Sequence, residues 1–264
     1  MKNPIITLLS DFGTKDHYVA SMKGTILNIN SQCTLVDITH DIKSHDIEEG
    51  AFILSNVYSF FPRGTIHLCV VDPGVGGPRN PILLVTADHF FVGPDNGIFT
   101  FVLAREKVKQ MVALTNQKYF LSQVSMTFHG RDLFAPVVGH LSLGVKPNAF
   151  GKKVRSWTKL TFRKPRVEGR KLVGEILHID TFGNLISSID EEHLLHFVKG
   201  RAYFIRAGKR MIRGLKKGYW EGRKNEAMAL LGSGGLLEIS FRERSAQKIL
   251  KAEKGDQITI ETSE

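Results

Sequence analysis

The sequence contains only two cysteines, Cys33 and Cys69, and they do not form a Cys-x-x-Cys pair. This scarcity indicates a reducing cytoplasm and excludes a thiolate metal site. No apolar run is long enough to span a bilayer. The first residues, Met1 to Asp11, lack the apolar length and the small-residue cleavage pattern of a signal peptide. We therefore expect a cytoplasmic protein with no membrane partner.

Acidic residues are fewer than basic ones: the sequence has 26 Asp and Glu and 36 Lys and Arg, which gives a net charge of +10. Much of the excess lies in residues 152–171 and 201–224. Basic patches can bind nucleic acid. These segments carry few stacking aromatics and no nucleic-acid motif, so solvated faces of a basic protein are favoured. Nucleic acid is therefore not an expected partner.

The apolar content, 42% of 264 residues, suffices for one large domain or two modest ones. Up to about residue 160 the pattern alternates strands and helices, which is typical of an α/β fold with a largely parallel sheet. Lys, Arg and Pro then accumulate, and the rest alternates short strands with turns, typical of a small β-barrel. We expect an N-terminal α/β catalytic domain over residues 1–160 and a C-terminal β-barrel domain over residues 161–264.

The segment from Cys69 to Arg79, CVVDPGVGGPR, is the strongest local candidate for a site. It follows a short apolar run that predicts a buried strand, which Pro73-Gly74 ends. Asp72 is thus placed at the carboxyl end of a strand, where ligands bind in open α/β sheets. The glycines allow close backbone approach. Taken alone, the segment is better explained as a capped turn with a solvated Asp and Arg, so local features do not establish a site.

A second carboxylate follows a strand near the N-terminus. Residues 5–9 predict a strand that ends at Ser10-Asp11, and the next helix and strand complete a βαβ unit. Asp11, Asp16 and nearby histidines superficially resemble a metal-ligand set, but no pair has a metal-specific spacing, so we expect no metal. Asp46 followed by Glu49 is better explained as a capping box for a helix at residues 47–58.

Two later turns carry polar side chains. Gly93-Pro94-Asp95-Asn96-Gly97 starts a short helix at residues 98–104, and its side chains either face a ligand or close the turn. Asp132 is placed to cap a helix at residues 133–143, with His129 just outside it. A lone histidine is usually structural, but near a helix N-terminus it tends to stay neutral, as a general base requires.

Five motifs occur in the order of one known family, and together they span nearly the whole chain. They are Ser10-Asp11-Phe12-Gly13, Val71-Asp72-Pro73-Gly74-Val75-Gly76, Gly93-Pro94-Asp95-Asn96-Gly97, Phe128-His129-Gly130-Arg131-Asp132 and Asp180-Thr181-Phe182-Gly183-Asn184. The sequence thereby resembles the S-adenosyl-L-methionine (SAM) hydrolases, also called SAM hydroxide adenosyltransferases. The resemblance implies hydrolysis of SAM to adenosine and methionine, with SAM as substrate and no cofactor. It also implies a homotrimer that binds SAM between neighbouring subunits.

The resemblance assigns the attacking water to three catalytic residues, Asp72, Arg79 and His129. The related fluorinase and chlorinase do not keep this trio, so water is favoured as the nucleophile. Which of Asp72 and His129 accepts the proton stays open. Alternatives are a SAM-dependent halogenase on the same scaffold, a non-catalytic SAM- or nucleoside-binding protein, and a basic nucleic-acid-binding protein.

The resemblance also implies substrate contacts. Asp11 is similar to a carboxylate that holds the ribose hydroxyls and Asp16 to a neighbouring polar position, while other positions match contacts near the methionine part. These are Asp180, Asn184 and Ser233, and Phe182 offers an aromatic face to the sulfonium. The fluorinase has Arg at the position of Gly234 and Trp at that of His45, which leaves methionine recognition and ribose packing open.

Overall fold

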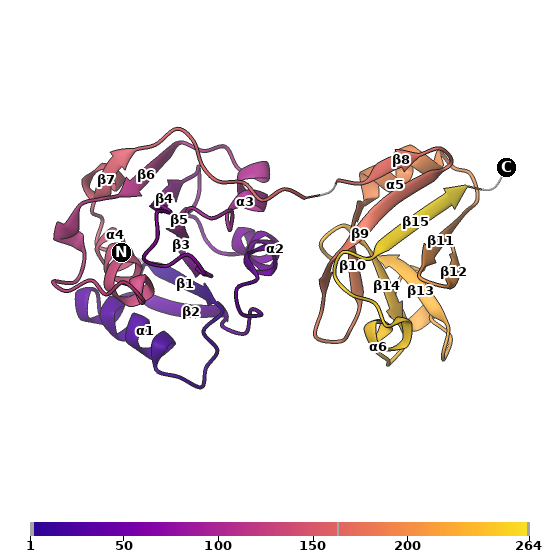
Figure 1. Ribbon diagram of the computed structural model, residues 1–264, viewed down its shortest axis with the longest axis horizontal. Coiled ribbons are helices and arrows are strands. Elements are labelled where there is room, and N and C mark those ends of the chain that lie inside the picture. The colour runs from indigo at the N-terminus through magenta and orange to yellow at the C-terminus, as the bar shows by residue number, and fades with distance from the viewer. Residues whose placement is uncertain (1–2, 163, 263–264) are drawn as a thin grey trace. The chain divides into compact units, whose positions relative to one another are not determined.

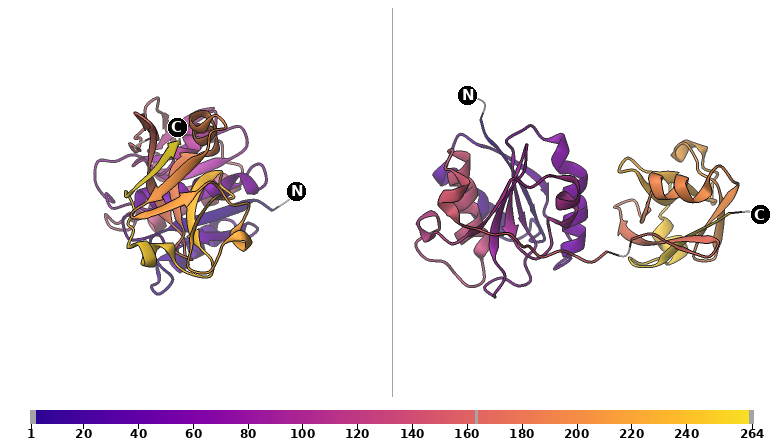
Figure 2. Two further views of the ribbon diagram at one scale, coloured as in Figure 1. Left: turned by 90° about the vertical axis from the view of Figure 1, so that its right-hand side faces the viewer. Right: turned by 90° about the horizontal axis from the view of Figure 1, so that it is seen from above.

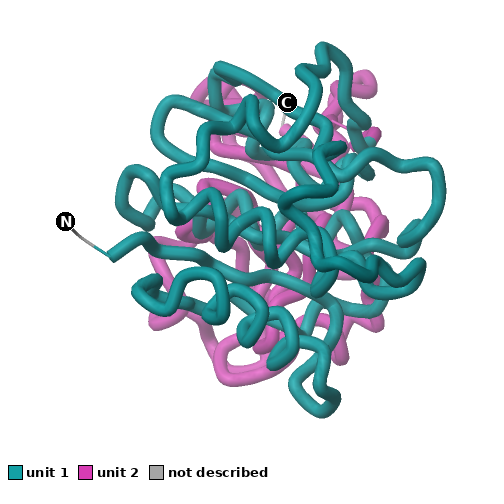
Figure 3. The backbone as a smooth tube through the Cα atoms, turned by 90° about the vertical axis from the view of Figure 1, so that its left-hand side faces the viewer, with its two compact units in different colours: residues 1–160 teal, residues 161–264 magenta. Residues whose placement is uncertain are grey.

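Alternating strands and helices build the N-terminal part of the chain, and antiparallel strands build the rest (Figure 1). The structure, a computed structural model, describes residues 3–162 and 164–262. It divides into an N-terminal unit, residues 1–160, and a C-terminal unit, residues 161–264 (Figure 3). Each unit has a hydrophobic core of its own, so each can be described by itself.

The N-terminal unit is built on a seven-stranded mixed sheet with the order β2-β1-β3-β5-β4-β6-β7. The first four strands in this order are parallel, and the remaining pairings are antiparallel. The expected α/β class is confirmed, with a parallel half and an antiparallel half. The strands are β1 (Ile5–Ser10), β2 (Thr34–Thr39), β3 (Ile66–Val70), β4 (Pro81–Val85), β5 (Phe90–Pro94), β6 (Gln110–Leu114) and β7 (Gly151–Lys153).

Helices cover both faces of this sheet (Figure 2). One core joins the sheet to α1 (Tyr18–Ile29) and α4 (Ala135–Ser142), and the other joins it to α2 (Ile47–Val57) and α3 (Thr100–Arg105). Every residue of β3 is buried, and all of them except His67 are apolar. This composition is typical of a strand that is covered on both faces.

The predicted helix start at Asp46 is confirmed in part. The Asp46 side chain accepts a hydrogen bond from the Glu49 amide, as a capping residue does. The Glu49 carboxylate accepts a hydrogen bond from the Lys43 amide, which ties the preceding loop to the first turn of the helix.

The C-terminal unit contains one antiparallel eight-stranded sheet that curls into a nearly closed barrel, with its apolar core inside. The order is β12-β11-β15-β9-β10-β14-β13, and β8 pairs with β9. Its elements are β8 (Arg166–Glu168), β9 (Lys171–Ile179), β10 (Leu185–Asp190), α5 (Glu191–Val198), β11 (Tyr203–Ala207), β12 (Arg210–Arg213), β13 (Ala227–Leu231), β14 (Leu236–Phe241), α6 (Ala246–Leu250) and β15 (Gln257–Thr262). In the described part of the chain, no helix has the length and apolar character needed to cross a bilayer.

Candidate active site

The two carboxylates predicted at strand ends lie at the same edge of the N-terminal sheet. Strands β1 and β3 are parallel neighbours, and Ser10 pairs in register with Val70. Asp11 and Asp72 follow these two positions, so both extend beyond the carboxyl ends of adjacent strands. This is the edge at which ligands bind in open α/β sheets.

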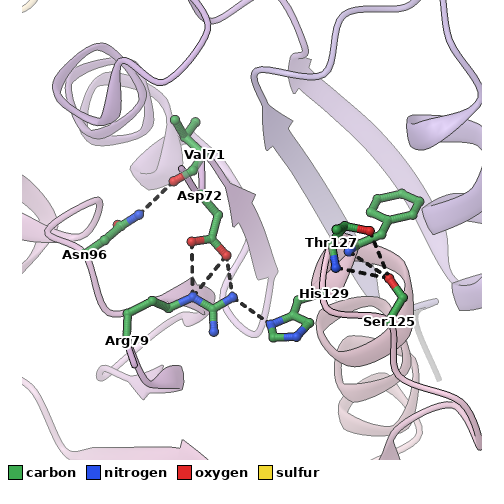
Figure 4. A network of polar contacts seen from close by, with 8 residues as sticks. Val71, Asp72, Arg79, Asn96, Ser125, Thr127 and His129 are labelled. Carbon is green, nitrogen blue, oxygen red and sulfur yellow. Dashed lines mark hydrogen bonds and ion pairs between the residues drawn. The ribbon is translucent and has the colours of Figure 1, made fainter. Parts of the chain in front are cut away.

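Arg79 joins Asp72 to His129 (Figure 4). Its Nε lies 3.1 Å from each carboxylate oxygen of Asp72, and its Nη2 also contacts Oδ2. The same Nη2 lies 2.8 Å from Nδ1 of His129. Only 10% of the Arg79 side chain and 4% of the Asp72 side chain are exposed. The structure therefore brings the three residues of the predicted trio into one hydrogen-bonded group.

The hydrogen bond from Arg79 determines the state of the His129 ring. A guanidinium only donates hydrogen bonds, so Nδ1 of His129 is an acceptor and a neutral ring carries its proton on Nε2. Burial lowers the pKa of His129, the positive charge of Arg79 lowers it further, and the carboxylates of Asp72 and Asp132 act in the opposite direction. The neutral ring is thus favoured near pH 7.

Two loop contacts hold this group in place. Gly76 has a φ of +75°, and a Cβ there would clash with the carbonyl oxygen of Met126, so only glycine fits between the Asp72 loop and the segment before His129. The Asn96 side chain donates to the carbonyl of Val71 at 2.8 Å and accepts from the Ile98 amide. Asn96 therefore closes its turn and supports the residue before Asp72.

The prediction that Asp132 caps a helix is wrong. Asp132 lies inside a π-helical turn, Gly130–Phe134, which runs directly into α4. Its fully buried carboxylate accepts from the Ser125 amide at 2.8 Å and pairs with Arg131. Because His129 immediately precedes this turn, the Asp132 contacts help to fix where the imidazole points. Such π turns are frequent at functional sites.

Asp11 is held by the backbone of a neighbouring loop. Its Oδ2 accepts a hydrogen bond from the His45 amide at 2.9 Å, and 8% of its side chain is exposed. His45 has a φ of +69°, which is uncommon for a residue other than glycine. The His45 ring stays largely exposed, and Asp16 lies in the exposed loop before α1.

A network around the buried side chains of Ser10 and His40, which sequence patterns did not reveal, supports the Asp11 loop. Nδ1 of His40 lies 2.7 Å from Oγ of Ser10, and its Nε2 lies 3.1 Å from a carboxylate oxygen of Asp37. Since a carboxylate accepts, Nε2 carries a proton, and in a neutral ring Nδ1 then accepts from the Ser10 hydroxyl. The Ser10 oxygen in turn accepts from the Phe12 amide. Ser10 is fully buried, so it orients the loop rather than acting as a nucleophile. The sequence signal for this pair is that Ser10 is the last residue of β1 and His40 directly follows β2, its parallel neighbour.

The C-terminal unit has a cavity of about 530 Å³ that contains three of the predicted contacts. Its lining includes Asp180, Phe182, Asn184, Tyr219 and Ser245. Asp180 and Asn184 are hydrogen-bonded to each other across the turn between β9 and β10. Ser233 lies in the exposed turn between β13 and β14 and is not part of this lining. Tyr219 and Ser245 were missed, because their separation from Asp180 in the sequence hides their proximity.

The chain matches the sequence profiles of two domains. The SAM hydroxide adenosyltransferase N-terminal domain matches residues 6–151, and the SAM hydroxide adenosyltransferase C-terminal domain matches residues 174–259. The chain belongs to the SAM hydroxide adenosyltransferase family. The predicted resemblance is thereby confirmed at the level of the family.

The chain is similar to two curated enzymes and to one protein of known structure. The (R)-S-adenosyl-L-methionine hydrolase of Methanocaldococcus jannaschii is 35% identical, over 97% of this chain and 95% of its own. A fluorinase of an Actinoplanes species is 29% identical, over 73% of this chain and 74% of its own. The crystal structure of an uncharacterized conserved protein from Thermotoga maritima matches with a TM-score of 0.90 and 34% identity, over 97% of this chain and 99% of that chain.

Proposed function

We propose that the protein hydrolyses SAM to adenosine and L-methionine, with water attacking the 5′ carbon of the ribose. The observation that carries the proposal is the Arg79 guanidinium, which is shared between the Asp72 carboxylate and a neutral His129 in a member of this family. The similarity to a curated SAM hydrolase over nearly the whole length of both chains supports the same reaction.

The chemistry requires activation of water more than of the leaving group. Methionine departs from the sulfonium as a neutral thioether, so it needs neither a metal nor an acid. Water is a weak nucleophile and must approach in line with the carbon–sulfur bond. Holding it in that position can supply up to ~7–11 kcal/mol, because the translational and rotational freedom is lost on binding rather than in the reaction.

The hydrogen bonds within the trio suggest a division of roles. Arg79 stays protonated, so it orients the water and stabilises the developing hydroxide. The acceptor lone pair of His129 already receives the hydrogen bond from Arg79. Among the described residues, Oδ1 of Asp72 accepts one hydrogen bond, at 3.1 Å from Nε of Arg79, and has room for another. We therefore assign Asp72 as the proton acceptor and His129 as the residue that orients Arg79 and donates from Nε2.

The remaining predicted residues are proposed as substrate contacts. Asp11 binds the ribose hydroxyls with Asp16 nearby, and the turn with Asp180 and Asn184 binds near the methionine part. Phe182 offers its largely exposed ring to the sulfonium, and Ser233 faces the methionine carboxylate. We further propose a cytoplasmic homotrimer in which neighbouring subunits complete each site, with no cofactor.

The test is hydrolysis in heavy-oxygen water, with the products separated by chromatography and weighed by mass spectrometry. The label should appear in the 5′ hydroxyl of adenosine and not in methionine, and a metal chelator should leave the rate unchanged. Since the name of the relative specifies the R configuration, both sulfonium epimers are assayed. Asp72→Asn, which keeps the size of the side chain, should bind SAM without turning it over.

Other products would contradict the proposal in distinct ways. Free adenine would indicate cleavage of the glycosidic bond, and adenosylhomocysteine would indicate methyl transfer. A 5′-halogenated nucleoside as the main product in halide-rich buffer would favour the halogenase alternative. Binding of SAM without any product would favour a non-catalytic binding protein.

A further inference from the structure

The C-terminal barrel buries a carboxylate that the proposed mechanism does not use. Glu238 lies on β14, is only 5% exposed, and pairs in register with Leu230 of β13. Its Oε1 accepts hydrogen bonds from the Tyr219 hydroxyl at 2.7 Å and from Oγ of Ser240 at 2.6 Å. Among the described residues, its hydrogen bonds come from hydroxyls and not from a cation. A buried carboxylate without a cation is costly for stability, so its presence calls for another reason.

The Tyr219 hydroxyl links this carboxylate to the cavity of the C-terminal unit. Tyr219 lies in the long connection between β12 and β13, and its half-exposed ring lines the cavity beside Asp180, Phe182 and Asn184. Burial raises the pKa of Tyr219, as do the hydrogen bond and the charge of Glu238 and the charge of Asp180. The hydroxyl thus keeps its proton and donates it to Glu238. This bond anchors a ring that its connecting loop alone would leave mobile.

The second carboxylate oxygen lies against another part of the predicted substrate shell. A Cβ at Gly232 would lie 2.9 Å from Oε2 of Glu238, so this oxygen packs against the backbone of the β13–β14 turn. The next residue in that turn is Ser233, the predicted contact to the methionine carboxylate. One buried side chain therefore supports both the Tyr219 wall of the cavity and the turn that carries Ser233.

We propose that Glu238 is a positioning residue for substrate binding: it holds Tyr219 as a wall of the C-terminal cavity and supports the Ser233 turn. The inference rests on the proposed function, because the cavity is taken to bind part of SAM. Glu238 acts through Tyr219 and the turn, and it does not touch the reacting atoms. Its removal should therefore weaken binding and leave the chemical step nearly unchanged.

The experiment compares four variants of the full chain by kcat and KM for SAM. Tyr219→Phe should raise KM by about tenfold, the effect of one lost hydrogen bond to a charged group. Glu238→Leu should raise KM by at least as much, because it also removes the support of the Ser233 turn, and kcat should stay within roughly twofold in both. Glu238→Gln should stay near wild type, because its amide oxygen can still accept from the hydroxyl. Ser240→Ala, which removes the other hydroxyl from the same carboxylate, is the matched control and should leave KM unchanged.

A double variant separates positioning from general destabilisation. Tyr219→Phe combined with Glu238→Leu should raise KM no more than Glu238→Leu alone, because Glu238→Leu already removes the contact to Tyr219. Additive effects, or a wild-type KM in a folded Tyr219→Phe protein, would overturn the inference. If Glu238→Leu fails to fold, Tyr219→Phe still decides, since it removes a single hydroxyl from a half-exposed ring.

The inference can fail separately from the proposed function. If the wild-type protein releases no adenosine, the proposed function is wrong whatever the variants do. The same variants are then compared by calorimetric binding of SAM and adenosine. A tenfold weaker affinity in Tyr219→Phe, together with a wild-type affinity in Glu238→Gln, would still support Glu238 as the residue that positions the cavity wall. Unchanged affinities in all variants would overturn it.

Discussion

At the scale of single residues, the state of His129 depends on its burial and on Arg79, a residue 50 positions away in the sequence. Burial lowers the pKa of the ring, and the Arg79 guanidinium lowers it further and occupies Nδ1. If the ring gained a proton, Nδ1 would become a donor facing a donor, and the contact with Arg79 would be lost. The neutral ring is therefore the form in which the trio is intact.

The need for a neutral His129 predicts how kcat/KM falls at low pH. Because the pKa of His129 in the folded protein lies below the ordinary value near 6.5, the midpoint of the fall in kcat/KM on the acid side should lie below pH 6.5. His129→Gln, whose amide oxygen can still accept from Arg79, should lose the part of this fall that is due to the imidazole. Its turnover should fall by up to roughly 10²-fold, since the water is held less accurately. A midpoint above pH 6.5, or a fall that is unchanged in the variant, would contradict the assignment.

At the scale of elements, the site is assembled from loops that follow rigid strands. The Asp72 loop leaves β3, the segment before His129 enters the π turn, and the two meet where Gly76 faces Met126. Because the two loops approach so closely, Arg79 and His129 can share a hydrogen bond although they are 50 positions apart in the sequence.

Gly76→Ala tests this approach. The new Cβ would clash with the Met126 carbonyl and would also strain the positive φ, which costs roughly 1–3 kcal/mol. We expect a lower melting temperature and a loss of turnover of up to roughly 10²-fold, since the two loops must separate. Gly64→Ala is the matched control: its φ is +87°, but nothing lies within 4 Å of the added Cβ. It should lower stability and leave turnover unchanged; equal turnover losses in both variants would argue against the loop contact.

At the scale of the whole molecule, the predicted functional residues are divided between the two units. The trio and Asp11 belong to the N-terminal unit, whereas Asp180, Phe182 and Asn184 line a cavity of the C-terminal unit. In the proposed homotrimer, the N-terminal unit of one subunit and the C-terminal unit of its neighbour complete each site. A closed ring of head-to-tail contacts would produce three such sites.

Subunit mixing tests this arrangement. Asp72→Ala disables the N-terminal unit, and Phe182→Asp disables the C-terminal cavity at a side chain that is 79% exposed, so folding should persist. Each variant alone should be nearly inactive. Co-expressed in equal amounts, they should recover roughly one quarter of wild-type activity, because that share of sites pairs two intact units. Recovery no greater than the single variants, or a monomeric mass in sedimentation, would contradict sites between subunits.

Local chemistry in the sequence determined much of the fold and part of the site. The apolar run before Asp72, the strand before Asp11 and the cap at Asp46 depend on neighbours in the chain, so they could be recognised from patterns. The turn with Asp180 and Asn184 was also recognisable, since both residues lie in one short connection between paired strands. The order of the five motifs pointed to the family because it is a property of the linear sequence.

Tertiary structure alone decided which of these groups meet and in what state. The bond between Arg79 and His129 and the bond between Tyr219 and Glu238 join distant segments, and no local propensity encodes such pairings. The role of Asp132 was misjudged for the same reason: a cap is a local interaction, but this carboxylate is held by Ser125 from the preceding loop within a π turn. The protonation state of His129 likewise follows from burial and from charges brought close by folding, which a sequence does not contain.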